Sequence, residues 1–538
     1  MRLNKGAFGG CDNLNYNEYG NALYLGNNSV NPYFALIMIK DSGMSACDIH
    51  STAVIIADCA FSGCKSLTSV TIGNSVKSIG SRAFYGCNVT DIYITDIGAW
   101  CDISGIRELM SYGSKNKKIY LNGIEIKDLV MPNGVTSIDS QAFKGCTNLT
   151  SVTIGNSVTT IDSQAFNGCT RLTSVTIGNS VTSSGSQAFN GCTRLTSVTI
   201  GNSVTSIGGS AFNGCNVSDI YITDIRAWCD ISGLRELMSY GSKNKKIYLN
   251  GIEIKHLVIP NGITVIGAQA FYVCTSLTSV TIGNSVTTIG DSAFRGCTSL
   301  TSVVIPDSVT SIGSSAFYGC TSLTSVVIPD SVTSIGQSAF YGCTSLTSVV
   351  IPDSVTSIGQ SAFRGCTGLT SVTIGNSVTT IGSQAFNGCT SLTSVTIGNS
   401  VTSIDSNAFR GCTSLTSVTI PDSVTSIGQY AFYGCTSLTS VIIGNSVTSI
   451  GQDVFYDCKS LTSIVIPDSV TSIGTQAFSN CSSLREVYYT GNEEQWNAIT
   501  NGGQNDYLYA ATRYYYSETE PQGEGNHWHY VDGQIVKW

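Results

Sequence analysis

Residues 297–319 read CTSLTSVVIPDSVTSIGSSAFYG, and the next two segments, 320–342 and 343–365, repeat them with changes at only two positions. Catalysis needs a few dissimilar groups that converge on one place, whereas this chain presents the same groups many times in a row. A fixed period of this length is the signature of a solenoid, in which each repeat forms one coil and contacts only its neighbours. The repeat therefore predicts the fold class.

Cysteine is the clearest marker of the period. Ten cysteines follow one another at intervals of 23 residues: Cys274, Cys297, Cys320, Cys343, Cys366, Cys389, Cys412, Cys435, Cys458 and Cys481. The same interval relates a second run, Cys146, Cys169, Cys192 and Cys215, and also the pair Cys64 and Cys87. We therefore expect a solenoid of 23-residue coils over residues 58–483.

Within one coil, the apolar residues indicate which side chains are buried. Leu300, Val303 and Ile305 follow an L-x-x-V-x-I pattern, and the last two alternate with exposed positions as in a strand. The Pro306–Asp307 pair then turns the chain. The conformational entropy lost when about 23 residues become ordered costs more free energy than the burial of about eight apolar side chains supplies. A single coil should therefore be unfolded, and stacking should pair the strands into a parallel sheet.

Two coils are longer than the others and nearly identical to each other. They have 36 residues, lie near 95–131 and 223–259, and differ at two positions between DIYITDI and NGIEI. Each predicts a short helix after an aspartate cap, carrying Trp100 or Trp228, and a hairpin with an Asn-Gly turn. Each also has a lysine cluster that we expect to lie on an exposed tip and to contact ligand: Lys115, Lys117 and Lys118 in one, and Lys243, Lys245 and Lys246 in the other. The alternative is a duplicated segment whose lysines are merely solvated.

The two ends depart from the repeat. Residues 1–57 predict irregular coils, with a hairpin in the segment that contains NALYLGNNSVNPYFALIMIK. Ala7, Phe8, Gly10 and Cys11 match the middle of a repeat, so we expect an incomplete N-terminus. Residues 484–538 predict a C-terminal cap with a helix around Trp496 and closing strands, because the last coil otherwise exposes a sheet edge.

Composition argues against several classes of protein. The 538 residues carry a net charge of −8, whereas nucleic-acid binding needs a dense basic face. No apolar run is long enough to span a membrane. Only four histidines occur, and none lies in a catalytic or complete metal-binding motif. We therefore expect no enzyme activity, no catalytic residue, no metal site and no cofactor.

Two repeated groups have a structural and a functional interpretation. The cysteines are spaced about 5 Å apart along a sheet, which suits disulfides, but they occupy an interior position, so we favour packed thiols. Asp307, Asp330 and Asp353 share one turn in successive coils and could hold calcium. Other coils have asparagine there, so we favour solvated turn residues.

One position of the repeat varies freely from coil to coil. It is the x of the AFxGC phrase, and its variation indicates a solvent-facing position. Tyrosine and arginine, which often anchor interfaces, recur there and form our second candidate ligand-binding set: Tyr272, Arg295, Tyr318, Tyr341, Arg364, Arg410, Tyr433 and Tyr456. Other coils carry Tyr85, Lys144, Asn167, Asn190, Asn213 or Asn387 there. Drift at an unconstrained site is the alternative explanation.

The LxxLxI-P-x-x-V-x-x-I-x-x-x-A-F-x-x-C pattern resembles the BspA-like leucine-rich repeat of bacterial and trichomonad surface proteins. The resemblance covers almost the whole chain, and the AF…C half separates it from other leucine-rich repeats. It implies an α/β repeat solenoid, curved and right-handed, with the parallel sheet on the concave face. It also implies an extracellular or surface-displayed adhesion protein, with a secretion signal lost with the N-terminus.

From the repeat and the resemblance together we expect a monomeric, non-enzymatic protein. Its partners would be protein or glycan ligands on host cells or matrix. The alternative is a structural spacer that presents another module and binds nothing itself.

Overall fold

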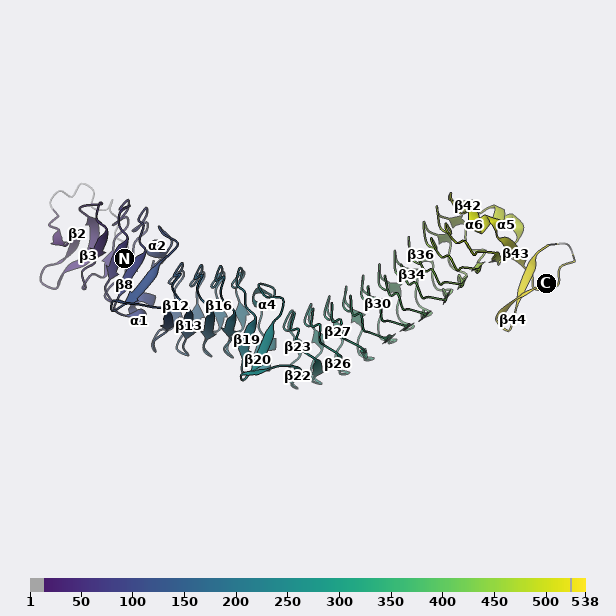
Figure 1. Cartoon of the computed structure of the whole chain (residues 1–538), viewed down its shortest axis with the longest axis horizontal. Helices are drawn as coiled ribbons and strands as arrows, with labels where there is room; N and C mark the ends of the chain where they lie inside the picture. Colours follow the sequence, from purple (N-terminus) through teal and green to yellow (C-terminus); the bar gives the residue numbers. More distant parts are fainter. Residues whose placement is uncertain (1–13, 523–524) are drawn as a thin grey trace. The chain divides into compact units, whose positions relative to one another are not determined.

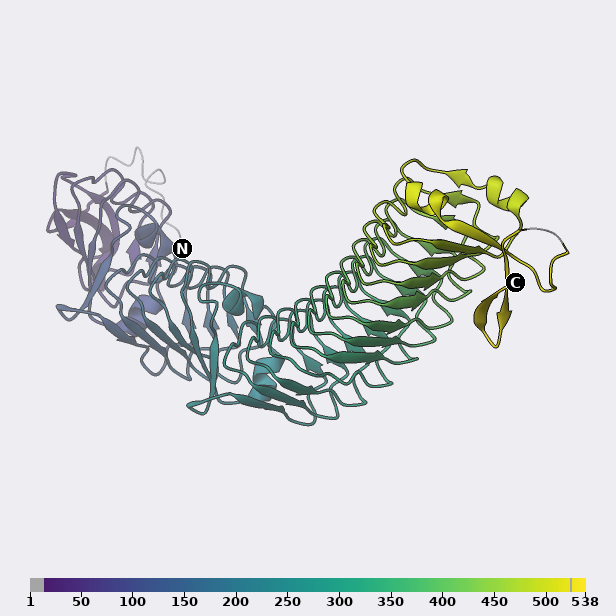
Figure 2. The same ribbon diagram turned by 45° about the vertical axis from the view of Figure 1, so that its right-hand side comes forward.

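The computed structural model describes residues 14–522 and 525–538. The chain forms two compact units, Met1–Glu253 and Ile254–Trp538, called here the N-terminal and the C-terminal unit. Each is a stack of coils whose strands pair in parallel with the strands of the neighbouring coils (Figures 1 and 2). The parallel-sheet solenoid predicted from the repeat is confirmed. The matching residues at the N-terminal end, Ala7, Phe8, Gly10 and Cys11, lie outside the described residues.

Most ordinary coils contribute a longer strand and a two-residue strand. In the coil that opens the sequence analysis, these are β26 (Ser302–Val304) and β27 (Ser311–Ile312). In the coil of residues 320–342 the longer strand is reduced to an isolated bridge between Ser302 and Ser325. Successive coils pair with a shift of 23 residues, so that Ser279 lies opposite Ser302 and Thr288 lies opposite Ser311. The return segment of the coil, which contains the Ala-Phe pair, is a series of turns without helix.

In the C-terminal unit, the two-residue strands form one sheet. Its members are β23 (Val265–Ile266), β25 (Thr288–Ile289), β27, β28 (Ser334–Ile335), β30 (Ser357–Ile358), β32 (Thr380–Ile381), β34 (Ser403–Ile404), β36 (Ser426–Ile427), β38 (Ser449–Ile450), β40 (Ser472–Ile473) and β42 (Thr500–Asn501). The longer strands are β22 (His256–Ile259), β24 (Ser279–Ile282), β26, β29 (Ser348–Ile351), β31 (Ser371–Ile374), β33 (Ser394–Thr396), β35 (Ser417–Thr419), β37 (Ser440–Ile442), β39 (Ser463–Ile466), β41 (Glu486–Tyr489), β43 (Thr512–Tyr516), β44 (His527–Val531) and β45 (Gln534–Lys537).

The N-terminal unit has the same plan. Its longer strands are β4 (Ala46–Asp48), β6 (Ser69–Ile72), β8 (Asp91–Ile94), β9 (Lys118–Leu121), β11 (Asp128–Val130), β13 (Ser151–Ile154), β15 (Ser174–Ile177), β17 (Ser197–Thr199), β19 (Asp219–Ile222) and β20 (Lys246–Leu249). The two-residue strands β10 (Ile124–Glu125) and β21 (Ile252–Glu253) pair antiparallel with β9 and β20. The remaining strands are β1 (Asn17–Tyr19), β2 (Ala22–Asn27), β3 (Asn31–Ile39), β5 (Ile55–Ile56), β7 (Ser78–Ile79), β12 (Ser137–Ile138), β14 (Thr160–Ile161), β16 (Ser183–Ser184) and β18 (Ser206–Ile207).

The core is a set of parallel side-chain ladders, one residue per coil. Leu300, Val309 and Phe317 are completely buried. The phenylalanine rings stack from coil to coil, with 5.3 Å between the ring centroids of Phe317 and Phe340. This stacking supplies the burial that a single coil lacks, and it holds the adjacent AFxGC turns in register.

The enlarged coils contain the helices of the N-terminal unit. These are α1 (Ile97–Cys101), α2 (Arg107–Met110), α3 (Ile225–Cys229) and α4 (Arg235–Met238). Asp96 and Asp224 cap α1 and α3 through their side chains, as the sequence predicts. The hairpins β9–β10 and β20–β21 turn at Asn-Gly pairs; Asn122 and Gly123 have φ values of 50° and 83°. The second helix of each coil is not predicted by the sequence.

The two ends carry antiparallel pairs. Strands β2 and β3 form a hairpin in the N-terminal unit, and β44 and β45 form one at the C-terminal end. Helix α5 (Glu493–Asn497) contains the predicted Trp496, and α6 (Asp506–Ala510) follows it. The segment 484–538, which the sequence analysis predicts to be a cap, is called the cap below. Within it, buried Trp528 packs on Tyr488 of β41 and on Val465 of the preceding strand, β39.

Candidate functional site

Arginine and tyrosine side chains of the AFxGC turns stack on one another along the C-terminal unit. The Arg295 guanidinium lies 4.1 Å from the centroid of the Tyr318 ring, and the rings of Tyr318 and Tyr341 stack at 4.5 Å. Arg364 then lies over Tyr341 at 5.6 Å and donates a hydrogen bond to Gln384. Cation–π and ring stacking therefore link four successive coils at this position.

An arginine followed by two stacked tyrosines recurs five coils after Arg295. Arg410 lies 4.7 Å from the Tyr433 ring centroid, and Tyr433 stacks on Tyr456 at 4.8 Å. Asn387 separates the two stacks, and Tyr272 lies half-buried at the start of the column. We call the set Arg295, Tyr318, Tyr341, Arg364, Arg410, Tyr433 and Tyr456 the arginine–tyrosine column. The structure thus brings together seven of the eight residues of the second candidate set.

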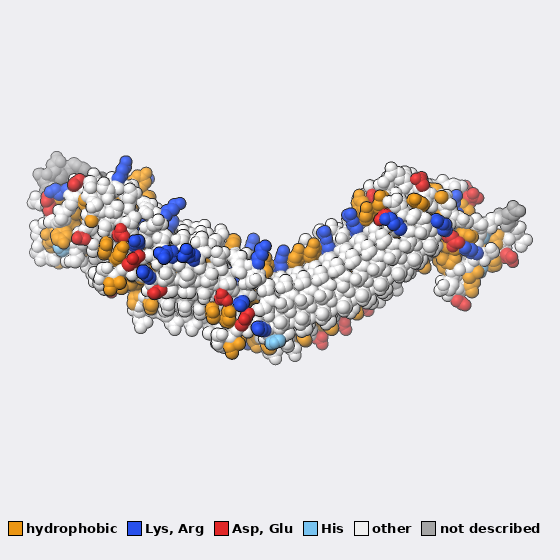
Figure 3. Space-filling view, viewed as in Figure 1, with side chains coloured by type: hydrophobic (Ala, Val, Ile, Leu, Met, Phe, Trp, Pro, Cys, Tyr) orange, Lys and Arg blue, Asp and Glu red, His pale blue; other side chains and the backbone are white. Residues whose placement is uncertain are grey.

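The column is the cationic feature of an otherwise neutral face. None of the ion pairs among the described residues involves Arg295, Arg364 or Arg410. Figure 3 shows Lys or Arg and hydrophobic side chains in a line along the upper edge of the C-terminal unit, above a broad uncharged surface. Six of the seven side chains are half-buried and Arg410 is exposed. Because the ring faces are covered by their neighbours in the stack, the column presents guanidinium groups and ring edges to solvent.

The lysine clusters of the enlarged coils are only partly exposed, and the prediction for Lys117 and Lys245 is wrong. Both side chains are completely buried. The Lys117 amine donates hydrogen bonds to the carbonyl oxygens of Val89 and Tyr112, and Lys245 bonds the equivalent oxygens of Val217 and Tyr240. Burial lowers the pKa of Lys117 to about 8. The remaining lysines, Lys115, Lys118, Lys243 and Lys246, are exposed.

The repeat cysteines form the predicted ladder of packed thiols. They are buried and free of disulfides among the described residues. Each thiol along most of the ladder donates to the phenylalanine carbonyl of the preceding coil; Cys320 Sγ lies 3.2 Å from the Phe294 oxygen. Burial raises the pKa of Cys366 to about 12. The ladder is therefore core. Asp307, Asp330 and Asp353 are exposed at their turns, as expected.

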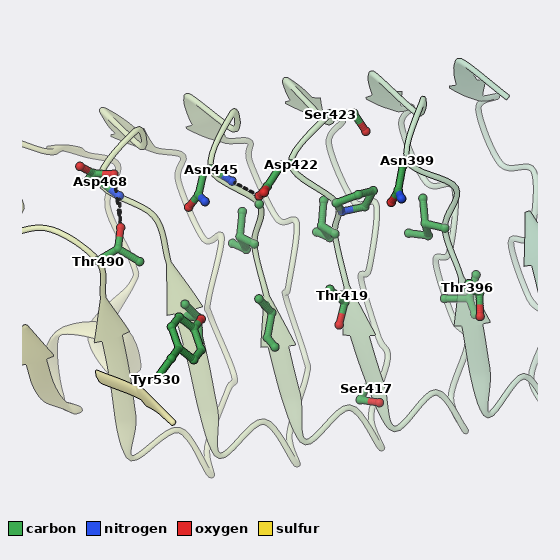
Figure 4. Close-up of a pocket in the computed structure, with 18 of the residues that line it drawn as sticks. Thr396, Asn399, Ser417, Thr419, Asp422, Ser423, Asn445, Asp468, Thr490 and Tyr530 are labelled. Carbon is green, nitrogen blue, oxygen red and sulfur yellow. Dashed lines mark hydrogen bonds between the residues drawn. The ribbon is translucent and has the colours of Figure 1, made fainter. Parts of the chain in front are cut away.

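A groove that sequence reasoning missed lies on the strand face of the C-terminal unit, beside the β44–β45 hairpin (Figure 4). It has a volume of about 1080 Å³. Its floor is formed by β33, β35, β37 and β39, and Tyr530 of the hairpin closes one side. Asn399, Asp422, Asn445 and Asp468 lie along one margin, where the strands end. The signal in the sequence is weak because the groove depends on where the cap folds back.

The floor belongs to a row that continues across the unit. The row is the exposed middle position of each longer strand. Before the groove it carries Val304, Val327 and Val350, whose exposed fractions are 59%, 75% and 63%. Within the groove it carries Thr396 and Thr419, followed by Ile442 and the buried Val465 nearest the cap. The row therefore bears hydroxyls at the end of the groove away from the cap and is apolar beside the cap.

Among residues 14–522 and 525–538, no three His, Cys, Asp or Glu side chains gather as metal ligands would. Within the same residues, every helix is too short or too polar to cross a membrane. His527 and His529 are partly buried, and the His529 ring stacks on Trp538 at 3.9 Å.

Comparisons with known proteins match this architecture. The family model of the BspA type leucine rich repeat region matches residues 39–101, 115–228, 243–370 and 356–485, more than half of the chain. A leucine-rich repeat protein from Bacteroides ovatus is 31% identical over 74% of this chain and 93% of its own, with a TM-score of 0.53. A leucine rich cell surface protein from Faecalibacterium prausnitzii is 25% identical over 91% of this chain and 98% of its own, with a TM-score of 0.28.

A comparison with curated proteins gives no match. The matched ranges contain the Leu, Val, Ile, Ala, Phe and Cys ladders that form the core. The chain therefore belongs to the family of BspA-type leucine-rich repeat proteins.

Proposed function

We propose that this chain is a non-enzymatic binding protein, displayed on a cell surface or secreted, that adheres to protein ligands through the arginine–tyrosine column. The observation that carries the proposal is the continuous stacking of Arg295, Tyr318, Tyr341 and Arg364 on successive coils. Tyrosine and arginine contribute more binding energy per residue than other side chains at interfaces. A column with both, on an otherwise uncharged face, marks the surface that a partner would contact.

The geometry of the column favours an acidic, extended partner. Stacking fixes the rotamers of the tyrosines before a ligand arrives, which lowers the entropy lost on binding. The arginines lack carboxylate partners among the ion pairs of the described residues, so they can pair with acidic groups of a ligand. Because coils repeat at about 4.8 Å, weak contacts along the column can add up as multivalent binding.

The family supports the surface location. Leucine-rich repeat folds commonly mediate protein interactions, and the related Faecalibacterium protein is described as a cell surface protein. The exposed lysines Lys115, Lys118, Lys243 and Lys246 of the enlarged coils form a second contact in this proposal. Their charge suits the same acidic class of ligand.

The test is binding of the full chain to an array of purified extracellular-matrix and cell-surface proteins. The column variant replaces the seven column residues by asparagine, which this chain itself carries at Asn167, Asn190 and Asn213. We expect wild type to bind at least one protein of the array and the column variant to lose at least tenfold in affinity. Raising the salt concentration should weaken wild-type binding more than residual binding of the variant.

The matched control replaces Val304, Val327 and Val350 by threonine, which occupies the same position at Thr281 and Thr373. This variant keeps the column and should bind like wild type. Equal binding by wild type and the column variant would contradict the column as contact surface. If no protein of the array binds, the chain is better described as a structural spacer.

A further inference from the structure

The groove beside the cap is a built site on a different face from the column. Trp528 is completely buried, and its Nε1 donates to the Tyr489 carbonyl at 3.0 Å, which fixes the β44–β45 hairpin on the sheet. Two residues on, Tyr530 packs edge to face against Trp528 and remains 40% exposed. The hairpin thus holds one aromatic ring over the strand face where the groove opens (Figure 4).

The groove lining combines polar and apolar side chains and contains no Lys or Arg. Hydroxyls of Thr396 on β33 and of Ser417 and Thr419 on β35 form one half of the floor, and Ile442 and Val465 form the half beside the hairpin. The margin alternates amides and carboxylates, and Asp422 accepts a hydrogen bond from the Asn445 backbone with one oxygen, which leaves its second oxygen for another donor. Burial, together with the nearby Tyr516 and Asp422, raises the pKa of Tyr530, so the ring stays neutral at physiological pH.

We propose that this groove binds a neutral oligosaccharide that runs across the strands. Asparagine, aspartate and threonine side chains can bond the vicinal hydroxyls of a sugar, and Tyr530 offers its face to the apolar side of a pyranose ring. The two carboxylates, Asp422 and Asp468, disfavour sulfated, sialylated or other anionic chains. The site does not rest on the arginine–tyrosine column and goes beyond the function proposed for it.

The spacing of the groove favours a sugar chain over a peptide. Parallel strands repeat at about 4.8 Å, which is close to the length of one pyranose unit along an extended glycan. In an extended peptide, the side chains on one face repeat at about 6.6 Å. This repeat does not match the spacing of the threonines on successive strands. Strands β37 and β39 are paired on both sides. Strands β33 and β35 lie in successive coils, where the Thr416 N–H donates to the Thr393 carbonyl, so a peptide cannot enter the floor as a further strand.

The test uses a panel of soluble neutral hexasaccharides: cellohexaose, maltohexaose, xylohexaose, mannohexaose and chitohexaose. Calorimetry with the full chain should give a dissociation constant of 1 mM or tighter for at least one of them. Tyr530→Ala should weaken binding tenfold or more, whereas Tyr530→Phe, which keeps the ring, should lose no more than about twofold. The column variant should bind the same sugar as wild type does, which separates this site from the proposed function.

The threonine row supplies the matched controls. The double change Thr396→Val with Thr419→Val removes two floor hydroxyls and should weaken binding at least fivefold. The fold tolerates it because Val304 and Val350 occupy the same position in other coils. Thr373→Val lies one coil outside the groove and should leave affinity unchanged. No binding of any hexasaccharide, or Tyr530-dependent binding of an arginine-rich peptide instead, would overturn the proposal.

Discussion

At the scale of single residues, Lys117 shows how a charged side chain becomes part of the core. Its backbone pairs with that of Cys146, and its amine lies close to the thiols of Cys87 and Cys146. The lysine therefore fills the gap in the thiol ladder that the enlarged coil creates. It also donates hydrogen bonds to the buried Val89 carbonyl and to the partly buried Tyr112 carbonyl. Lys245 makes the corresponding bonds to two carbonyls in the second enlarged coil.

Lys117 should make the stability of the fold depend on pH in a predictable direction. Its pKa is about 8 in the folded chain, against 10.5 for an ordinary lysine. Between these values the unfolded chain binds more protons, so the lysine's contribution to stability rises as pH increases from 8 toward 10.5. The unfolding free energy of wild type should therefore rise relative to that of Lys117→Met by up to about 1.4 kcal/mol per pH unit.

Urea unfolding of both proteins at pH 7.5, 8.5 and 9.5 measures this difference. Because the thiols are common to both proteins, their titration cancels in the comparison. Lys118→Met, at the exposed neighbour, is the control and should show no such trend. A difference between wild type and Lys117→Met that stays constant with pH would contradict the assignment.

At the scale of elements, side chains replace main-chain groups wherever the stack of ordinary coils is interrupted. In ordinary coils, the phenylalanine N–H donates to the alanine carbonyl of the next coil, as Phe455 does to Ala477. After the last coil, the Asn505 side chain takes the place of that carbonyl and accepts from Phe478 N–H at 2.9 Å. At the first enlarged coil, Trp100 Nε1 supplies the missing donor to the Ala142 carbonyl.

Asn505→Leu should therefore destabilise the C-terminal end of the solenoid. Leucine has nearly the same volume but cannot accept from Phe478 or donate to the Gly474 carbonyl. A buried donor and acceptor left without partners cost about 1–3 kcal/mol each. Urea unfolding should show that loss, and amide exchange at Phe478 should accelerate. Asn505→Asp keeps the acceptor and should protect the Phe478 amide better than leucine does.

How far the sequence predicts these elements depends on whether the signal is repeated. The ladders that contain Leu300, Phe317 and Cys320 are predicted by a 23-residue pattern that recurs many times in the sequence. The parallel pairing of the strands is predicted by the stacking of these repeats. The burial of Lys117 does not follow, because a lysine between Asn116 and Lys118 is typical of an exposed turn. The groove is likewise missed: Tyr530 reaches the sheet only because the hairpin folds back, which no local pattern indicates.

At the scale of the whole molecule, the thiol ladder makes stability sensitive to alkali. In the C-terminal unit burial raises the thiol pKa of nine ladder cysteines above the ordinary 9.0: Cys297, Cys320, Cys343, Cys366, Cys389, Cys412, Cys435, Cys458 and Cys481. Below pH 9 these thiols are protonated in both states. Above it, the unfolded chain releases protons that the folded chain retains, so the stabilisation is lost as pH rises above 9.

Stability of the full chain should therefore be level between pH 7 and 8 and fall steeply above pH 9. Each thiol exposed in the unfolding step contributes about 1.4 kcal/mol per pH unit, so the slope counts the thiols that become exposed together. Because coils interact only with their neighbours, that number reports the size of the cooperative unit. Urea midpoints by circular dichroism at pH 7, 8, 9 and 10, under reducing conditions, give the slope.

A variant with Cys343, Cys366 and Cys389 replaced by alanine should be less stable at pH 7, because each substitution leaves a cavity and removes a hydrogen bond. Its decline above pH 9 should nevertheless be shallower than that of wild type. An equally steep decline in both proteins would show that groups other than the ladder thiols govern alkaline unfolding.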